Sequence, residues 1–407
     1  MPSTLPQELI DLVVDELRND PVILRECSYV SSSFRRSGQK CLFYHIRILP
    51  PLDDERPTLC QKLYDLLKAS THIAPYVKCM EVIEGHTDTH ETFNGPPRRP
   101  WITVDQTLAL ILPLLRLRQF SLRCYIPVSL LASQLPTSLK ASFRDVLRSP
   151  TLTSLDLGQV ILTPSEFYFF LKGCTGLKEL SLFNVAVYSA LVSDGDQKET
   201  EVGLNAPRSQ LESLTIADSH GEILEHLLSP RSPMDLRYIH TLSLFGHIDA
   251  AHLDDLLQRS DAALQHLSLR EPYGTPMDFV FKPNQCPNLR TFYIAVRGTT
   301  NWARVFQNCS AGIEKLTLEL SHVNFSKLSG PEWKALDKVL ARFELRSLRE
   351  FTVKVHPGYP TDPSTGYSFA QSAGNVRRHL RALVSRSLLE MEPIPKFTRS
   401  SSWTIGY

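Results

Sequence analysis

Leu152-Thr153-Ser154-Leu155-Asp156-Leu157 is followed, 25 residues later, by Leu177-Lys178-Glu179-Leu180-Ser181-Leu182. Both segments place an apolar residue at the first, fourth and sixth positions. The last two apolar residues are two apart, so their side chains share one face of a short strand. The first apolar residue leads the chain into that strand. Each segment therefore predicts a short β-strand with one apolar face.

The same pattern recurs along most of the chain. Its copies start at residues 77, 117, 152, 177, 211, 239, 264, 289, 313 and 348. Several steps are 24 or 25 residues, within the period of roughly 20–29 residues that leucine-rich repeats have. Between copies the apolar residues shift to helical spacing, as in Phe167, Phe170 and Leu171. Stacked strand and helix units predict an α/β solenoid with parallel inner strands and outer helices.

The repeats depart from the leucine-rich consensus in one respect. That consensus places Asn or Cys three residues after the last apolar strand position, where this chain has residues such as Val160, Val185 and Ser219. We therefore expect an irregular solenoid over residues 47–393, followed by a tail over 394–407. The longer steps predict inserted loops near 84–103, 187–210 and 356–370.

Composition limits the classes of partner. Lys and Arg number 44 and Asp and Glu 43, for a net charge of +1, which provides no strong field for nucleic acid or a membrane surface. No apolar run reaches the roughly 18 residues that a membrane helix needs, and the N-terminus lacks a signal-peptide pattern. The eight cysteines are widely spaced and contain no CxxC pair. We expect reduced, mostly buried thiols and a cytoplasmic or nuclear location.

No motif of a known catalytic chemistry is present in the sequence. The nucleophile elbow, the phosphate-binding loop, the zinc-protease motif and the dinucleotide fingerprint are all missing. His86-Thr87-Asp88-Thr89-His90-Glu91 has the residue types of a metal site, but it lies in a Pro- and Gly-rich stretch that indicates a loop. We therefore predict a protein that binds a partner, with no catalytic residue, no cofactor and no metal.

Residues 1–46 form a separate N-terminal module in this interpretation. An amphipathic helix starts near Leu5-Pro6 and carries Leu9, Ile10, Val13 and Leu17 on one face. Asn19-Asp20-Pro21 ends it and begins a second helix. A third helix follows Ser31-Ser32-Ser33 and is expected to end within residues 42–46.

The module resembles a known adaptor-binding domain. Leu5-Pro6-x-Glu8-Leu9-Ile10, followed by Cys27-Ser28-Tyr29-Val30-Ser31-x-x-Phe34-Arg35 and Leu42-Phe43, resembles the F-box, and most of all the F-box-like family of mushroom-type fungi. Phe34 stands where many members carry Trp. The resemblance implies docking to the Skp-type adaptor of a Skp–cullin–F-box ubiquitin ligase. The docking residues that it implies are Leu5, Pro6, Leu9, Ile10, Val13, Leu24, Val30 and Phe34.

The expected function is that of a ligase subunit that recognises substrates. The alternative is a repeat scaffold without ligase attachment, in which the N-terminal helices only cap the first repeat. An unidentified target protein is expected on the strand face that points away from the core. The candidate residues there are Phe183, Phe245, His266, Arg270 and Tyr293. Inserted loops that bury the two phenylalanine rings remain the alternative for this face.

Overall fold

The computed structural model describes residues 5–51, 57–85, 100–124, 130–131, 135–188, 208–218, 222–246, 249–270, 286–296, 312–320, 347–355 and 389–393, with isolated positions in 334–338 and 374–384. The chain divides into two compact units, Met1–Ser209 and Gln210–Tyr407. The predicted domain limits at 46/47 and 393/394 stay predictions. The stretch His86–Glu91, the tail 394–407 and most of the predicted insertions lie outside the described residues.

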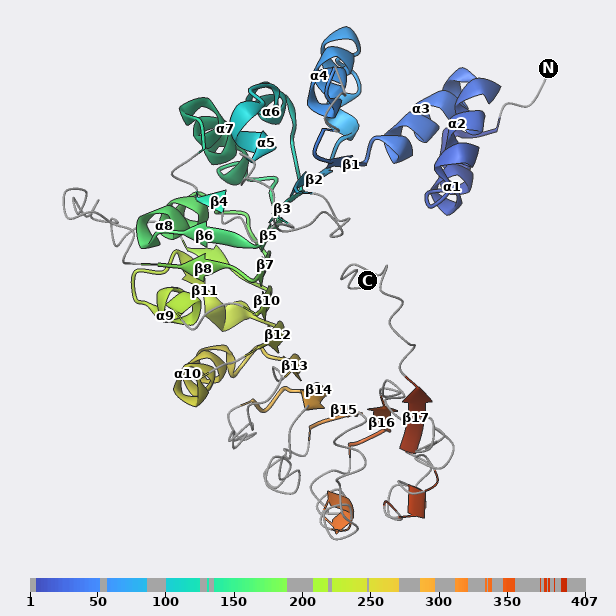
Figure 1. Cartoon of the computed structure of the whole chain (residues 1–407). Coiled ribbons are helices and arrows are strands. Elements are labelled where there is room, and N and C mark those ends of the chain that lie inside the picture. The colour runs from blue at the N-terminus through green and yellow to red at the C-terminus, as the bar shows by residue number, and fades with distance from the viewer. Residues whose placement is uncertain are drawn as a thin grey trace, which may run out of the picture. The chain divides into compact units, whose positions relative to one another are not determined.

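Unit 1 begins with three helices, α1 (Gln7–Glu16), α2 (Pro21–Val30) and α3 (Ser32–Leu42), and α3 packs against both others (Figure 1). The Asp20 side chain accepts hydrogen bonds from the backbone N–H groups of Val22 and Ile23, both at 3.0 Å. Ser31 caps α3 in the same way through the N–H of Phe34. Side-chain oxygens thus satisfy the exposed N–H groups at the starts of α2 and α3.

A small apolar core joins these helices. Ile10, Val14 and Leu24 are buried in it. The helices approach closely at Gly38, where a Cβ atom would lie 2.7 Å from Ser28 Oγ and 3.1 Å from the backbone oxygen of Leu24. The third helix, which was expected to end within residues 42–46, ends at Leu42. His45–Ile48 forms a strand, because its backbone pairs with the next strand.

Five strands of unit 1 lie side by side and parallel. In order they are β1 (His45–Ile48), β2 (Cys79–Glu84), β3 (Gln119–Cys124), β5 (Ser154–Gly158) and β7 (Glu179–Phe183). The register matches the repeat pattern, since Leu155 pairs with Leu180 and Leu157 with Leu182. The predicted α/β class and parallel strands are confirmed here. A second parallel sheet of β4 (Leu130–Leu131), β6 (Val160–Leu162) and β8 (Ala186–Val187) was not predicted.

Helices cover one face of these strands (Figure 1). They include α4 (Leu59–Ala69), α6 (Thr107–Ile111), α7 (Thr137–Leu147) and α8 (Pro164–Lys172), and neighbours in this order contact one another. The shorter elements are η1 (Ala74–Tyr76), α5 (Trp101–Val104) and η2 (Leu112–Leu114). A capping box between Thr163 and Glu166 begins α8. Phe143 and Phe167 bury their rings between helices and strands.

Unit 2 repeats this arrangement. Its parallel strands are, in order, β10 (Ser213–Ala217), β12 (Thr241–Phe245), β13 (His266–Arg270), β14 (Thr291–Val296), β15 (Lys315–Leu320), β16 (Glu350–Val355) and β17 (Leu389–Pro393). The strand β17 was not predicted. The other elements are β9 (Ser209–Gln210), which spans the division, α9 (Glu222–Leu228), β11 (Met234–Asp235), η5 (Leu236–Tyr238) and α10 (Ala250–Ser260).

A residue with left-handed backbone conformation follows several of the strands. Gln159, Asn184 and Asp218 have φ angles of 54°, 48° and 49°, and Gly246 has 114°. The N–H of Gln159 donates to the carbonyl of Phe183 at 2.7 Å, and that of Asp218 to Phe245 at 2.7 Å. The turns at Gln159 and Asp218 therefore each add one hydrogen bond to the parallel ladder before the chain leaves the sheet. A left-handed non-glycine residue costs about 1 kcal/mol or more, which this bond offsets.

Candidate functional site

The outer surface of the three N-terminal helices is rich in exposed apolar side chains. Ile10 and Val14 of α1 face the core, whereas Leu9, Leu12 and Val13 form a second stripe that is exposed. On α2 the exposed apolar residues lie opposite the buried Leu24. The exposed set is Leu5, Leu9, Leu12, Val13, Val22, Ile23, Tyr29 and Val30, with exposed fractions of 42% to 72%.

The structure divides the docking residues implied by the resemblance into two groups. Leu5, Pro6, Leu9, Val13 and Val30 are exposed, and Phe34 is half-buried. Ile10 and Leu24 lie in the core of the module, because α3 packs over them. Leu12, Val22, Ile23 and Tyr29 are exposed members that sequence reasoning missed. The sequence did hold a signal for them, since α1 has too many apolar residues for one stripe.

A polar network holds α1 against α3 beside this surface. Gln7 Nε2 donates to Asp11 Oδ1 and to Ser37 Oγ, both at 2.9 Å. The buried Ser37 hydroxyl also donates to Asp11. This hydrogen bond is the main reason that the pKa of Asp11 lies below its usual value. The network fixes the direction of α1 and therefore of its exposed apolar stripe.

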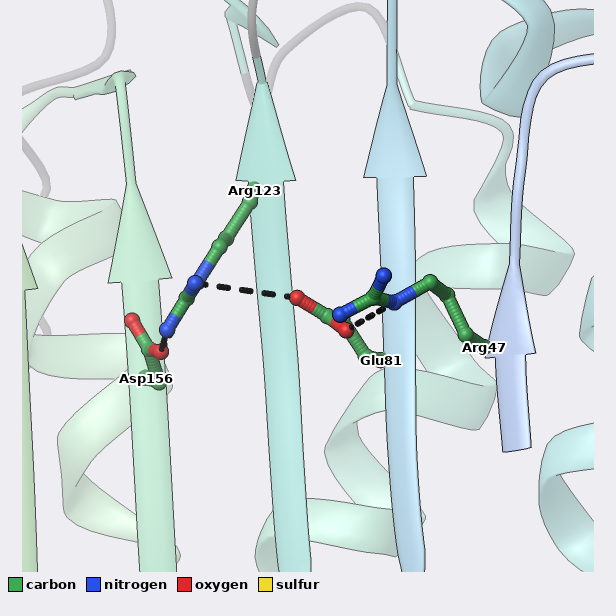
Figure 2. A network of polar contacts seen from close by, with 4 residues as sticks. All are labelled: Arg47, Glu81, Arg123 and Asp156. Carbon is green, nitrogen blue, oxygen red and sulfur yellow. Dashed lines mark hydrogen bonds and ion pairs between the residues drawn. The ribbon is translucent and has the colours of Figure 1, made fainter. Parts of the chain in front are cut away.

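The strand face of unit 1 carries a network of four charged residues (Figure 2). Arg47 Nε donates to Glu81 Oε2 at 2.6 Å, and Arg123 Nε donates to Asp156 Oδ2 at 2.9 Å. Arg123 Nη1 lies 3.7 Å from Glu81 Oε1 and joins the two pairs. Burial raises the pKa of Asp156, and the nearby Arg123 opposes that rise only in part. Each arginine of the network is thus held by a buried or half-buried carboxylate.

Phe183, a candidate from the sequence, lies beside this network. Its ring centre is 5.7 Å from Arg123 Cζ, within the range of a cation–π contact. Gly158 lies between them in the register, and a Cβ atom there would be 3.3 Å from Arg123 Cγ. A small residue on the intervening strand therefore allows contact between strands that are not adjacent.

Unit 2 holds a similar cluster. Arg270 Nη2 donates to Tyr293 Oη at 3.1 Å and to Glu319 Oε1 at 3.1 Å, and its Cζ lies 5.6 Å from the Phe245 ring centre. The Tyr293 hydroxyl donates to Glu319. Arg270 reaches Glu319 across the small Ala295, which pairs with both in the register. Three of the four unit 2 candidates are thus brought together with Glu319, which the prediction did not include.

Burial and neighbouring charges both shift the pKa values of the residues in this cluster. Burial raises the pKa of the Tyr293 hydroxyl, and the Glu319 carboxylate raises it further. Burial lowers the pKa of Arg270, but Tyr293 and Glu319 outweigh this effect and raise it overall. The cluster therefore holds a protonated tyrosine and a charged arginine over the ordinary pH range. His266 is exposed at the start of β13 and takes no part in these hydrogen bonds.

The two phenylalanine rings are half-buried, so each is partly covered and partly exposed. Among the described residues, no group of three His, Cys, Asp or Glu side chains could hold a metal ion. No helix in the described part of the chain is long and apolar enough to cross a membrane. The two surfaces described above offer ion pairs, hydrogen bonds and apolar area, which are the elements of protein recognition.

Comparison of the sequence with models of known protein families and with curated proteins finds no match.

Proposed function

We propose that this chain is a non-catalytic, substrate-recognition subunit of a Skp–cullin–F-box ubiquitin ligase. The observation that carries the proposal is the exposed apolar stripes of α1 and α2, which leave a three-helix module with uncovered apolar surface. The resemblance of about residues 4–46 to the F-box gives this surface its partner, a Skp-type adaptor. In this proposal the three-helix module binds the adaptor of the ligase, and the strand face binds the target protein.

The energetics favour a partner over an exposed surface. Monomeric proteins rarely expose large contiguous apolar patches. Full burial of one aliphatic side chain contributes about 1.5–3 kcal/mol, so burial of exposed residues such as Leu9, Leu12 and Val22 would offset part of the cost of association.

The strand face is the proposed site of the target protein. In the leucine-rich-repeat interpretation, parallel strands line the inner face of a solenoid and present the residues between the core positions. Interfaces favour aromatic residues and arginine at their energetic centres. The clusters around Arg123 with Phe183, and around Arg270 with Tyr293 and Phe245, have this composition. Buried carboxylates hold both arginines in place before a partner arrives.

The test is co-purification of the full chain with a Skp-type adaptor. The double variant Leu9→Asp with Val13→Asp places two charges on the exposed stripe of α1, and adaptor recovery should fall to background. Val104→Asp is the matched control, because Val104 is 64% exposed on α5 in the same unit. This control should bind the adaptor as the native chain does.

Three results would count against the proposal. Unchanged adaptor recovery by the double variant would remove the docking role of α1. A double variant that loses helical circular-dichroism signal would instead favour helices that only cap the first strands. Failure of the native, folded chain to bind any adaptor would favour the alternative function, a repeat scaffold without ligase attachment.

A further inference from the structure

The charged network on the strand face of unit 1 has only positive groups at its exposed end. Figure 2 shows the four side chains in front of the strands, on the side opposite to the helices. The side chains of Glu81 and Asp156 are 8% and 17% exposed, whereas those of Arg47 and Arg123 are 55% and 32% exposed. A molecule that approaches this face therefore meets guanidinium groups before carboxylates.

Arg47 keeps capacity for further hydrogen bonds. It donates to Glu81 through Nε, and no hydrogen bond among the described residues uses its two terminal nitrogens. A guanidinium has five N–H donors in a planar fork and can hold a carboxylate through two parallel hydrogen bonds. The hydrogen bond to Glu81 already orients the Arg47 side chain, so this side chain loses less conformational freedom when a ligand binds.

An apolar surface lies beside the second guanidinium. The half-buried ring of Phe183 contacts Arg123 across Gly158. Ser121 and Ser181, both with small side chains, pair with Asp156 on its two sides. Positive charge and aromatic surface thus lie next to each other on one sheet face.

We infer that this face of unit 1 binds a partner-protein segment in which an aspartate or glutamate lies next to an apolar residue. The carboxylate contacts Arg47 and Arg123, and the apolar side chain packs on Phe183. The inference rests on the proposed role of the strand face and adds the chemistry of the target. The two arginines and two carboxylates of the network carry no net charge between them, so a singly charged carboxylate held by one guanidinium fork suits this face better than a doubly charged phosphate.

The probes are fluorescein-labelled peptide pools titrated into the full chain and followed by fluorescence anisotropy. Each peptide has twelve residues with Glu-Leu at its centre and small uncharged residues elsewhere. Matched pools replace the Glu with Gln, Lys or phosphoserine. We expect the Glu pool to bind at least about tenfold more tightly than the other three, with affinity that falls as salt rises. Equal binding of the Glu and Gln pools, or preference for Lys, would overturn the site. Tighter binding of phosphoserine would overturn the assignment to a carboxylate.

Variants test whether the preference for the Glu pool comes from the charged network. Arg47→Gln should remove the preference for Glu over Gln. Arg47→Gln leaves the Glu81 carboxylate without this arginine. The double variant Arg47→Gln with Glu81→Gln removes that charge as well, so it provides the same test if the single variant is unstable. Arg144→Gln is the matched control, because Arg144 lies 4.9 Å from the Phe169 ring centre but on the helices. A preference that survives both Arg47 variants, or that the control also loses, would refute the inference.

Adaptor binding by the same samples separates this inference from the proposed function. Arg47 variants that retain the adaptor but lose the preference for Glu support both. A native chain that selects the Glu pool but never binds an adaptor contradicts ligase attachment and leaves the acidic-segment site intact. A chain that binds the adaptor and shows no preference among the pools contradicts the site alone.

Discussion

Adjacent residues of α1 should respond oppositely to the same truncation, because the helix carries two apolar stripes. Ile10 is 6% exposed in the module core, and Leu9 is 47% exposed on the outer stripe. Ile10→Ala removes three buried carbon groups at about 0.8 kcal/mol each and leaves a cavity, for a loss of about 3 kcal/mol. Leu9→Ala removes atoms that are already half in water, so its loss should stay below about 1 kcal/mol.

Hydrogen exchange of the full chain, read on peptides that cover α1 to α3, measures both effects. About 3 kcal/mol corresponds to roughly 150-fold faster exchange in Ile10→Ala, or to complete loss of protection if the module is less stable than that. Leu9→Ala should exchange at nearly the native rate and yet weaken adaptor binding. Equal exchange rates in the two variants, or faster exchange in Leu9→Ala, would refute the two-stripe arrangement.

Three further outcomes follow from the described contacts. Gly38→Ala should destabilise the module by about 1–3 kcal/mol in denaturant titration, and adding Ser28→Ala should recover part of the loss, because Ser28 Oγ is the nearest atom. The lowered pKa of Asp11 means that its ionised form stabilises the module above pH about 4, and that this contribution is lost as pH falls through the folded-state pKa. Asp11→Asn should therefore flatten the acid side of the stability profile, and an unchanged profile would contradict the hydrogen bond from Ser37. Glu319→Gln should lower stability by about 2 kcal/mol, since it leaves Arg270 without its counter-charge, and a melting temperature equal to the native one would show that the pair contributes nothing.

The strands were predictable because their signal is local. Alternating apolar residues such as Leu155 and Leu157 define one face of a strand wherever they occur, and the repeat placed ten of the twelve main strands. The strand β1 was missed because it follows directly on a helix, and only its pairing with β2 makes it a strand. The left-handed turn at Gln159 was also not predictable, because neither the residue type nor its neighbours require that conformation.

The candidate sites were predictable only in part, for a reason of geometry. Strand alternation assigned Phe183 and Arg270 to strand positions between the core residues, but ion pairs depend on contacts between strands that no single segment encodes. Arg270 meets Glu319 only because two strands bring them to either side of Ala295. In the module, the helical spacing did not separate Leu9 from Ile10, since which stripe faces inward depends on where α3 packs.

The central claim is that the exposed stripe of α1 and α2 binds a Skp-type adaptor. Isothermal titration of the purified full chain with the purified adaptor tests it most directly. We expect a one-to-one complex with affinity in about the micromolar range or tighter, lost in the Leu9→Asp, Val13→Asp variant and kept in Val104→Asp. No detectable binding by a native chain whose α1 to α3 are protected from hydrogen exchange would contradict the claim.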